Sequence, residues 1–190
     1  MSINIRKTLI EPTYSWSELA EAIHNNQKVI SVNDEIDIEL KDGQNVTLVC
    51  EKVDKDHALF STKDLLADTH NMNEDWIVKG ICTMDNYLNT RFRKLLPDEL
   101  SNVISGDIRL LTEKEIFGEN KYGAEESCSQ LERYKNPQNR IKKLNGVAFP
   151  WWTETSHVSS FTVFCYVRSD GSANNTTANY SRGVAPCFWI

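Results

Sequence analysis

The last 40 residues of this chain are rich in aromatic side chains and nearly balanced in charge. They hold eight of the 18 aromatic residues in the sequence and only four charged side chains, Glu154, Arg168, Asp170 and Arg182, whose charges cancel. Ser, Thr, Asn and Gly stand between the aromatic residues, which is typical of strands and polar loops in a packed β-rich region. Binding faces use the same residue types, because rigid rings give contact area at low entropic cost. The core and binding interpretations therefore both stay open.

Three aromatic residues of this region are the best candidates for the core. Trp151, Trp152 and Phe188 have large rings and uncharged surroundings, and each ring can bury on the order of 150–250 Å². We therefore predict that all three are buried core residues of a C-terminal sheet.

The rest of the chain carries all of the net charge. The first 150 residues contain 19 basic and 25 acidic side chains, which gives the net charge of −6. An acidic balance argues against a nucleic-acid-binding domain. No apolar run approaches the roughly 18 residues that a membrane-spanning helix needs, and the start MSINIRKTLIEPTYS lacks the features of a secretory signal. We expect a soluble protein without a membrane span, either cytoplasmic or associated with a virion.

The early chain predicts one helix followed by a small antiparallel sheet. The segment SWSELAEAIHNN, residues 15–26, has the pattern of a short amphipathic helix that Ser15 or Ser17 caps with support from Glu18. Strand candidates follow at residues 28–32, 36–40 and 45–53, separated by turn signals, and a further strand at HALFST leads into a helical turn.

The later chain predicts short helices and then short strands. Pro97 breaks a helical pattern over residues 85–104, and a strand candidate and a short helix from Thr112 to Gly118 come next. Residues 128–144 are typical of a helix or a pair of helical turns, and strands with a polar hairpin loop end the chain. This order predicts the α+β class, with a single domain over residues 14–190 and an N-terminal extension over residues 1–13.

The five cysteines do not indicate a metal site. Cys50, Cys82, Cys128, Cys165 and Cys187 form no C-x-x-C pair, and no histidine stands at zinc-ligand spacing. Buried free thiols are the default interpretation, while pairing of Cys165 with Cys187 stays open. We expect neither a metal ion nor a cofactor.

The order of several motifs resembles that of a known domain family. The segments YLNTRFRKLLPDEL, RIKKLNG, WWTETS, YVRSDGSANN and GVAPCFWI look like those of a family of unknown function that occurs in gut bacteria and their phages. The resemblance covers roughly residues 14–190. Members typically have Arg-Ser-Pro after the tryptophan pair and often Arg after Gly-Val, whereas this chain has Thr153–Ser156 and Ala185 there. Any function that depends on those arginines is absent from this chain.

The motif order also resembles C-type-lectin-like and formylglycine-generating-enzyme-like folds. This resemblance implies short antiparallel sheets with a few helices. Sugar-binding C-type lectins carry Glu-Pro-Asn or Gln-Pro-Asp and Trp-Asn-Asp elements as calcium ligands. This chain has Asn136-Pro137-Gln138, which lacks the carboxylate, and no Trp-Asn-Asp. We therefore expect no calcium-dependent sugar site.

The resemblance implies a non-catalytic, calcium-independent module for ligand binding or adhesion, associated with a phage or a cell surface. The ligand is a protein or a glycan that the sequence does not identify, and the oligomeric state also stays unknown. The alternative is a structural or assembly subunit of a phage particle or surface complex. An enzyme of the formylglycine-generating type is the third interpretation, although catalytic motifs such as G-x-S-x-G, the P-loop and H-E-x-x-H are absent.

The candidate ligand contacts lie in the polar C-terminal segment SDGSANNTTANYSRG. Loops on a rigid scaffold carry function more often than the scaffold does, although a polar hairpin loop needs the same residue types. Tyr180 is the natural central contact, because its ring offers apolar area and one hydroxyl. The predicted ligand-binding residues are Arg168, Asn174, Asn175, Thr176, Thr177, Asn179 and Tyr180.

Overall fold

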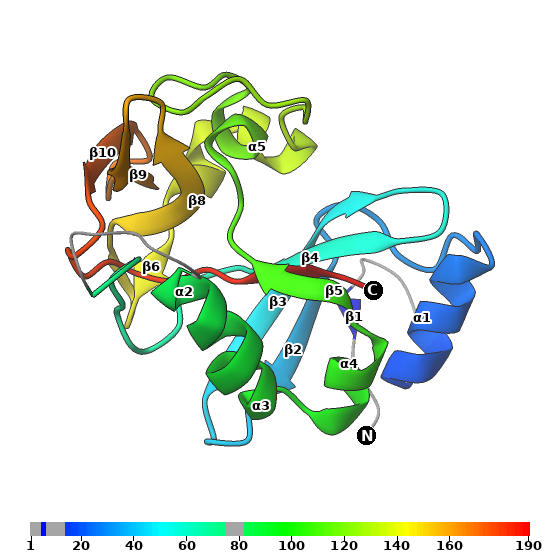
Figure 1. Cartoon of the computed structure of the whole chain (residues 1–190). Coiled ribbons are helices and arrows are strands. Elements are labelled where there is room, and N and C mark those ends of the chain that lie inside the picture. Colours follow the sequence, from blue (N-terminus) through cyan, green and yellow to red (C-terminus); the bar gives the residue numbers. More distant parts are fainter. Residues whose placement is uncertain (1–4, 7–13, 75–81) are drawn as a thin grey trace.

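The computed structural model describes residues 5–6, 14–74 and 82–190. It is a mixed α+β fold, and every pairing between its named strands is antiparallel. The main sheet has six strands in the order β1-β2-β3-β4-β11-β5, and a second sheet has the order β10-β9-β8. Figure 1 shows β8, β9, β10 and α5 gathered in one part of the molecule, away from helices α1, α3 and α4.

The first half of the chain forms the predicted helix and most of the predicted sheet. Helix α1 covers Trp16–His24, and Ser15 and Glu18 form a reciprocal capping box at its start. The strands of this half are β1 (Ile5–Arg6), β2 (Glu35–Glu39), β3 (Asn45–Val53) and β4 (Ala58–Thr62). Residues 28–32 form no strand, and no helical turn follows β4, so both of those predictions are wrong. Since β1 pairs with β2, part of the predicted N-terminal extension belongs to the sheet.

The middle of the chain is helical up to Pro97, as predicted, but its hydrogen-bond pattern changes along the way. The elements are α2 (Thr83–Asn86), a π-helical segment (Tyr87–Phe92), α3 (Arg93–Leu95) and α4 (Asp98–Val103). Asn89 connects this segment to the main sheet. Its side chain donates to the Ile108 carbonyl over 2.9 Å and accepts from the Ile108 N–H over 2.8 Å.

The remaining elements agree with the predicted strand-rich end. They are β5 (Ser105–Arg109), α5 (Glu113–Phe117), two 3-10 turns (Glu132–Lys135 and Pro137–Arg140), β6 (Lys143–Leu144), β7 (Val147–Ala148), β8 (Trp151–His157), β9 (Ser160–Val167), β10 (Ala173–Thr177) and β11 (Cys187–Trp189). Thr112 caps α5, and Gly118 ends it in the left-handed conformation at φ 81°. The pair of turns confirms one of the two alternatives for residues 128–144.

The main sheet separates two hydrophobic cores. Successive side chains of a strand point to opposite faces, so Phe60 of β4 and Phe188 of β11 enter one core, while Leu59 and Cys187 enter the other. Trp152 joins the first core and Trp151 the second. Burial of Trp151, Trp152 and Phe188 is confirmed, since all three are 0% exposed. Phe188, however, belongs to the main sheet rather than to the sheet of the tryptophans.

Cysteine pairing is also settled by the fold. All five cysteines are free, and Cys50, Cys165 and Cys187 are buried. Cys165 lies on β9 and Cys187 on β11, which belong to different sheets. The default interpretation of buried free thiols is therefore confirmed for these three residues.

Candidate functional site

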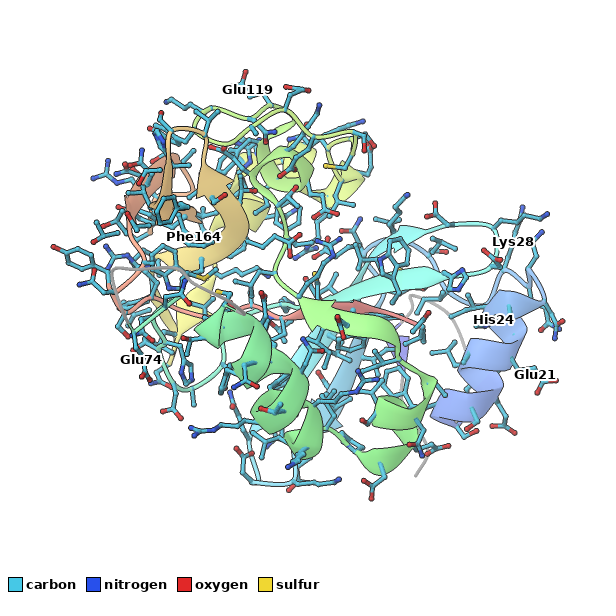
Figure 2. The ribbon with its side chains drawn as sticks, viewed as in Figure 1. Glu21, His24, Lys28, Glu74, Glu119 and Phe164 are labelled. Atoms are coloured by element: carbon cyan, nitrogen blue, oxygen red, sulfur yellow. The ribbon has the colours of Figure 1, made fainter. Side chains whose placement is uncertain are left out.

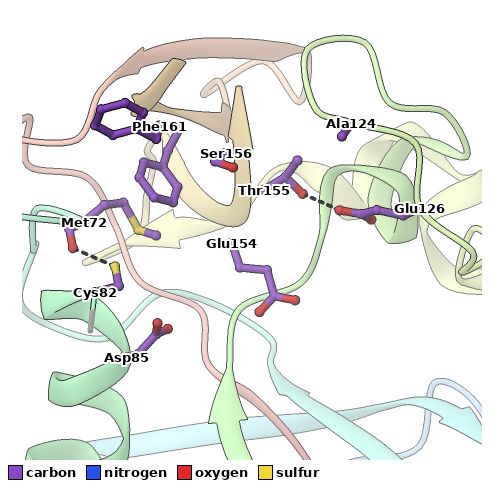
Figure 3. A pocket seen from close by; sticks show the side chains of 10 residues that line it. Met72, Cys82, Asp85, Ala124, Glu126, Glu154, Thr155, Ser156 and Phe161 are labelled. Atoms are coloured by element: carbon purple, nitrogen blue, oxygen red, sulfur yellow. Dashed lines mark hydrogen bonds between the residues drawn. The ribbon is translucent and has the colours of Figure 1, made fainter. Parts of the chain in front are cut away.

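A cleft of about 490 Å³ lies where the β8–β9 strands approach the helix α2 and the segment before it. Met72, Phe161 and Phe164 form its apolar wall, Glu126 and Glu154 form its acidic wall, and Asp85 on α2 adds a third carboxylate. Figure 3 shows Met72 and Phe161 on one side and Glu126 on the opposite side, with Glu154 between them. We call this the acid–aromatic cleft.

The aromatic part of the cleft is open to solvent. Phe161 is 65% exposed, although large apolar side chains are normally covered in a folded protein. Phe164 is buried at the base of the same wall, in the left part of the molecule in Figure 2. The cleft therefore presents an uncovered ring beside carboxylates.

Glu154 is the carboxyl group of this cleft whose pKa departs most from its usual value. Burial raises the pKa of Glu154 to about 7, the charge of Arg109 partly opposes this rise, and Glu115, Asp85 and Glu126 add to it. The Glu154 Oε1 atom lies 3.3 Å from Arg109 Nη1. A carboxyl group of this kind changes charge near neutral pH, so it can exchange a proton or pair with a cation there.

Arg109 is held mainly by a carboxylate behind the cleft. Its Nη1 and Nη2 atoms donate to the two oxygens of buried Glu115 over 2.8 and 2.7 Å. Burial by itself lowers the pKa of Arg109, but the hydrogen bond and charge of Glu115 raise it above the usual value. Nη1 also donates to the Leu110 carbonyl over 2.9 Å and to Glu154 Oε1 over 3.3 Å. Because these bonds and the fork-to-fork pairing with Glu115 occupy the guanidinium, Arg109 leaves Asp85 and Glu126 without a cation of their own.

Glu126 is fixed through Thr155 on β8. The Thr155 hydroxyl donates to Glu126 Oε1 over 3.2 Å and accepts from the Glu113 N–H over 2.8 Å. Gly123 approaches the same threonine so closely that an added Cβ would lie 2.1 Å from Thr155 Cγ2. The loop that carries Glu126 therefore packs tightly on β8.

Asp85 comes from the opposite side of the cleft, on α2. Burial raises the pKa of Asp85, and the charge of Asp107 adds to the effect. Among the described residues its carboxylate has neither a hydrogen bond nor an ion pair. Asp85 is therefore the carboxylate of the cleft with most capacity for an added partner.

The predicted ligand residues lie elsewhere, and only some of them come together. Asn175, Thr176, Thr177, Asn179 and Tyr180 share, with Val163, a surface hollow of about 460 Å³ that we call the β10 hollow. The structure corrects the loop prediction here, because residues 173–177 form a strand paired with β9. Regular pairing outweighs the turn preference of Asn and Thr when a neighbouring strand offers partners.

Two of the predicted residues do not line the β10 hollow. Asn174 lies opposite Tyr166, and Arg168 closes the β9–β10 turn through its N–H to the Ser172 carbonyl. The arginine beside Tyr180 is instead Arg182, whose guanidinium lies 5.4 Å from the Tyr180 ring centre and 4.8 Å from that of Tyr166. Arg182 therefore orients Tyr180, a role that the sequence did not indicate.

The acidic wall of the cleft was missed from the sequence, although one signal was present. Glu154 is the one formally charged residue between Trp151 and Val167, and a single carboxylate in an apolar strand suggests a role. Adjacent acidic residues such as Glu125 and Glu126 usually form a solvated face. In the structure Glu125 is exposed and pairs with Lys114, whereas Glu126 turns into the cleft.

The described residues contain neither a cluster of metal-ligating side chains nor a membrane-spanning helix. Residues 14–74 and 82–190 contain no group of three or more His, Cys, Asp or Glu side chains placed to hold a metal ion. Within the same ranges no helix has both the length and the apolar character needed to cross a membrane.

Comparison with known proteins gives one match. Residues 102–190 match a family described as a domain of unknown function (DUF6273). The expected resemblance to a family of unknown function is confirmed over this segment, and residues 14–101 lie outside it. No curated protein and no solved structure matches the chain. The matched segment supplies Glu126, Glu154 and the phenylalanines of the cleft, while Met72 and Asp85 come from the unmatched part.

Proposed function

We propose that the chain is a non-catalytic, calcium-independent ligand-binding module whose acid–aromatic cleft takes an organic cation with an apolar body. The observation that supports this most is that the exposed ring of Phe161 and three carboxylates line the same cleft. An ammonium group gains energy both from a carboxylate and from the face of an aromatic ring. The apolar body of the same ligand would cover Phe161.

The electrostatics of the cleft support a cationic ligand over an anionic one. Asp85, Glu126 and Glu154 face it, while the guanidinium of Arg109 pairs with Glu115. An anion would meet this negative wall without a free positive partner among the described residues. Like-charge juxtaposition of that kind excludes anionic ligands.

The thiols support the non-catalytic part of the proposal. Burial raises the pKa of Cys82, the cysteine that lines the cleft, and its thiol lies 3.0 Å from the Met72 carbonyl oxygen, which accepts its hydrogen bond. The pKa of each of the other four cysteines is raised as well. Cysteine catalysis needs a thiolate, so thiols of this kind do not favour a formylglycine-generating type of reaction.

The wider biological setting is also part of the proposal. A role in adhesion, a C-type-lectin-like fold and an association with gut bacteria and their phages rest on the motif resemblance. An assembly subunit is the alternative, and it predicts a defined oligomer that binds no small cation. Sedimentation measurements alongside the binding experiment below distinguish the two.

The first test compares a cation with its neutral counterpart. We expect 3-phenylpropylammonium to bind the purified chain at pH 8 and 3-phenylpropan-1-ol to bind about tenfold more weakly, because only the cation pairs with the carboxylates. Isothermal titration calorimetry measures both. Equal affinities, or no binding of the cation, would contradict the proposal.

The position of the site is tested with charge-matched variants. The double variant Asp85→Asn/Glu126→Gln removes two charges from the cleft, and Glu21→Gln/Glu119→Gln removes two from exposed positions far apart on the surface, as Figure 2 shows. We expect the first variant to weaken cation binding roughly tenfold, which is the size of effect expected for the loss of two partly exposed ion pairs. We expect the second variant to bind the cation as tightly as the unmodified chain. An equal loss in both would indicate a non-specific charge effect.

The cleft should also bind cations more tightly as the pH rises. Because burial raises the pKa of Glu154 to about 7, this carboxyl is mostly protonated at pH 6 and mostly ionised at pH 8. Arg109, Glu115, Asp85 and Glu126 are the charged groups around it, and none of them reverses this direction. We expect affinity for 3-phenylpropylammonium to increase roughly two- to fivefold from pH 6 to pH 8. Glu154→Gln should flatten that dependence, and an unchanged slope would exclude Glu154 as its source.

A further inference from the structure

Strand β10 is an open edge of the β10-β9-β8 sheet. It pairs with β9 along Ala173–Thr177 and with no other described strand. Figure 1 places it on the outer side of that sheet. An edge strand of this kind is a template on which another extended chain can pair.

The direction of the unpaired backbone groups follows from the bonds at the two ends of the pairing. The Arg168 N–H donates to the Ser172 carbonyl, and the Ala178 N–H donates to the Thr162 carbonyl, both over 2.8 Å. In an antiparallel pair, alternate residues face the partner. The backbone groups of Ala173, Asn175 and Thr177 therefore point away from β9.

Only some of these outward-pointing N–H and carbonyl groups form a hydrogen bond within the chain. The Asn174 side chain accepts from the Asn175 N–H over 2.8 Å, and the Thr177 carbonyl accepts from the Tyr180 N–H over 3.2 Å. The Thr177 N–H and the Asn175 carbonyl have no partner among the described residues. The edge thus retains a donor and an acceptor for an added strand.

The usual protection of edge strands is absent from this one. Natural edges carry lysine, inward charges or proline, which discourage pairing with another chain. Residues 171–181 contain neither a charged side chain nor a proline. We therefore expect the segment that pairs with this edge to be uncharged as well.

The β10 hollow lies beside the same edge and needs a large side chain to fill it. Val163 and Tyr180 supply apolar surface, and Tyr180 is 54% exposed. A second copy of β10 would offer only Ala, Asn and Thr side chains, which are too small for a hollow of about 460 Å³. This favours a partner of different sequence over self-association.

We propose that β10 binds an extended, uncharged peptide segment of a partner protein as a fourth strand, with one aromatic or large aliphatic side chain seated in the β10 hollow. Main-chain hydrogen bonds supply affinity in this mode of recognition, and the pocket for alternate side chains supplies specificity. The inference does not depend on the acid–aromatic cleft, which lies on different residues.

The experiment starts from a displayed library of random 12-residue peptides selected on the full chain. We expect enrichment of uncharged β-forming peptides, whose affinities are then measured by fluorescence anisotropy. Each enriched peptide is N-methylated at alternate residues, in two complementary sets. Methylation of the set that faces β10 should weaken binding about tenfold, while the other set should have little effect, because only one edge donates to β10. Equal effects of the two sets, or no enrichment, overturn the proposal.

Two variants at one position place the binding on the edge. Thr177→Pro removes the outward N–H and should weaken binding about tenfold, whereas Thr177→Ala keeps that N–H and should retain most of the affinity. Thermal melting checks that both variants fold, and the methylated peptides test the proposal if Thr177→Pro does not. Peptide binding that survives in a folded Thr177→Pro variant overturns it. A dimer of the unmodified chain that Thr177→Pro abolishes would assign the edge to a second copy instead.

Discussion

Replacing Trp152 by alanine should lower the free energy of unfolding by about 3–5 kcal/mol, the usual cost of deleting a large buried ring. Trp152 is 0% exposed, its ring meets Tyr166 edge-on at 6.1 Å, and its Nε1–H donates to the His70 carbonyl over 2.8 Å. The variant loses the packing and one of the two hydrogen bonds that the His70 carbonyl accepts, since the Arg182 N–H still donates to it. Urea denaturation measured by fluorescence gives the difference.

Phe161→Ala is the matched control for Trp152→Ala. Phe161 is also aromatic and lies in the same sheet, but it is 65% exposed, so its loss should change stability by less than about 0.5 kcal/mol. A Trp152→Ala variant that unfolds at the same urea concentration as the unmodified chain would show that this ring does not hold the core.

Replacing Arg109 by alanine should have the second largest effect. We expect it to lower the free energy of unfolding by about 3 kcal/mol. Removing one partner of a buried ion pair leaves the other charge unpaired, and here the buried partner is Glu115. We expect the lower end of the range for buried pairs, because 27% of the Arg109 side chain is exposed. Urea denaturation at pH 8 measures the loss.

A double-variant cycle separates the charge effect from lost packing. Glu115→Gln keeps an oxygen that can accept from the Thr112 N–H at the start of α5. Since a neutral glutamine does not need a cation, Arg109→Ala should cost clearly less in the Glu115→Gln background. Strictly additive effects would mean that the two side chains do not stabilise each other.

Several elements could be predicted because their signals are local. The capping residues of α1 and α5 lie within three positions of the groups they satisfy, and Gly118 supplies the left-handed conformation that ends α5. Strand β3 matches the apolar run at residues 45–53. Pro97 ends the helical segment because it lacks an N–H.

One strand prediction and one loop prediction failed because strand formation depends on which other strands lie alongside the segment. Residues 28–32 have strand-forming side chains and Ile30 is buried, yet they pair with none of the described strands. Residues 173–177 have turn-forming side chains, yet β9 offers them a full set of partners. Strand propensity mostly reflects packing against neighbouring strands, which a single segment does not contain.

The sequence by itself determined the chain's class, its capped helices, the burial of its tryptophan pair and the polar segment that became β10. Only the tertiary structure decided that Asp85, Glu126 and Glu154 meet across one cleft, that Arg109 pairs with Glu115 behind it, and that β10 is an open edge. The reason is physical: a cap depends on residues within a few positions, and a large apolar ring is driven out of water by its own surface. The charge of a cleft and the partner of a strand depend on segments that come together only when the chain folds, such as Asp85 and Glu154.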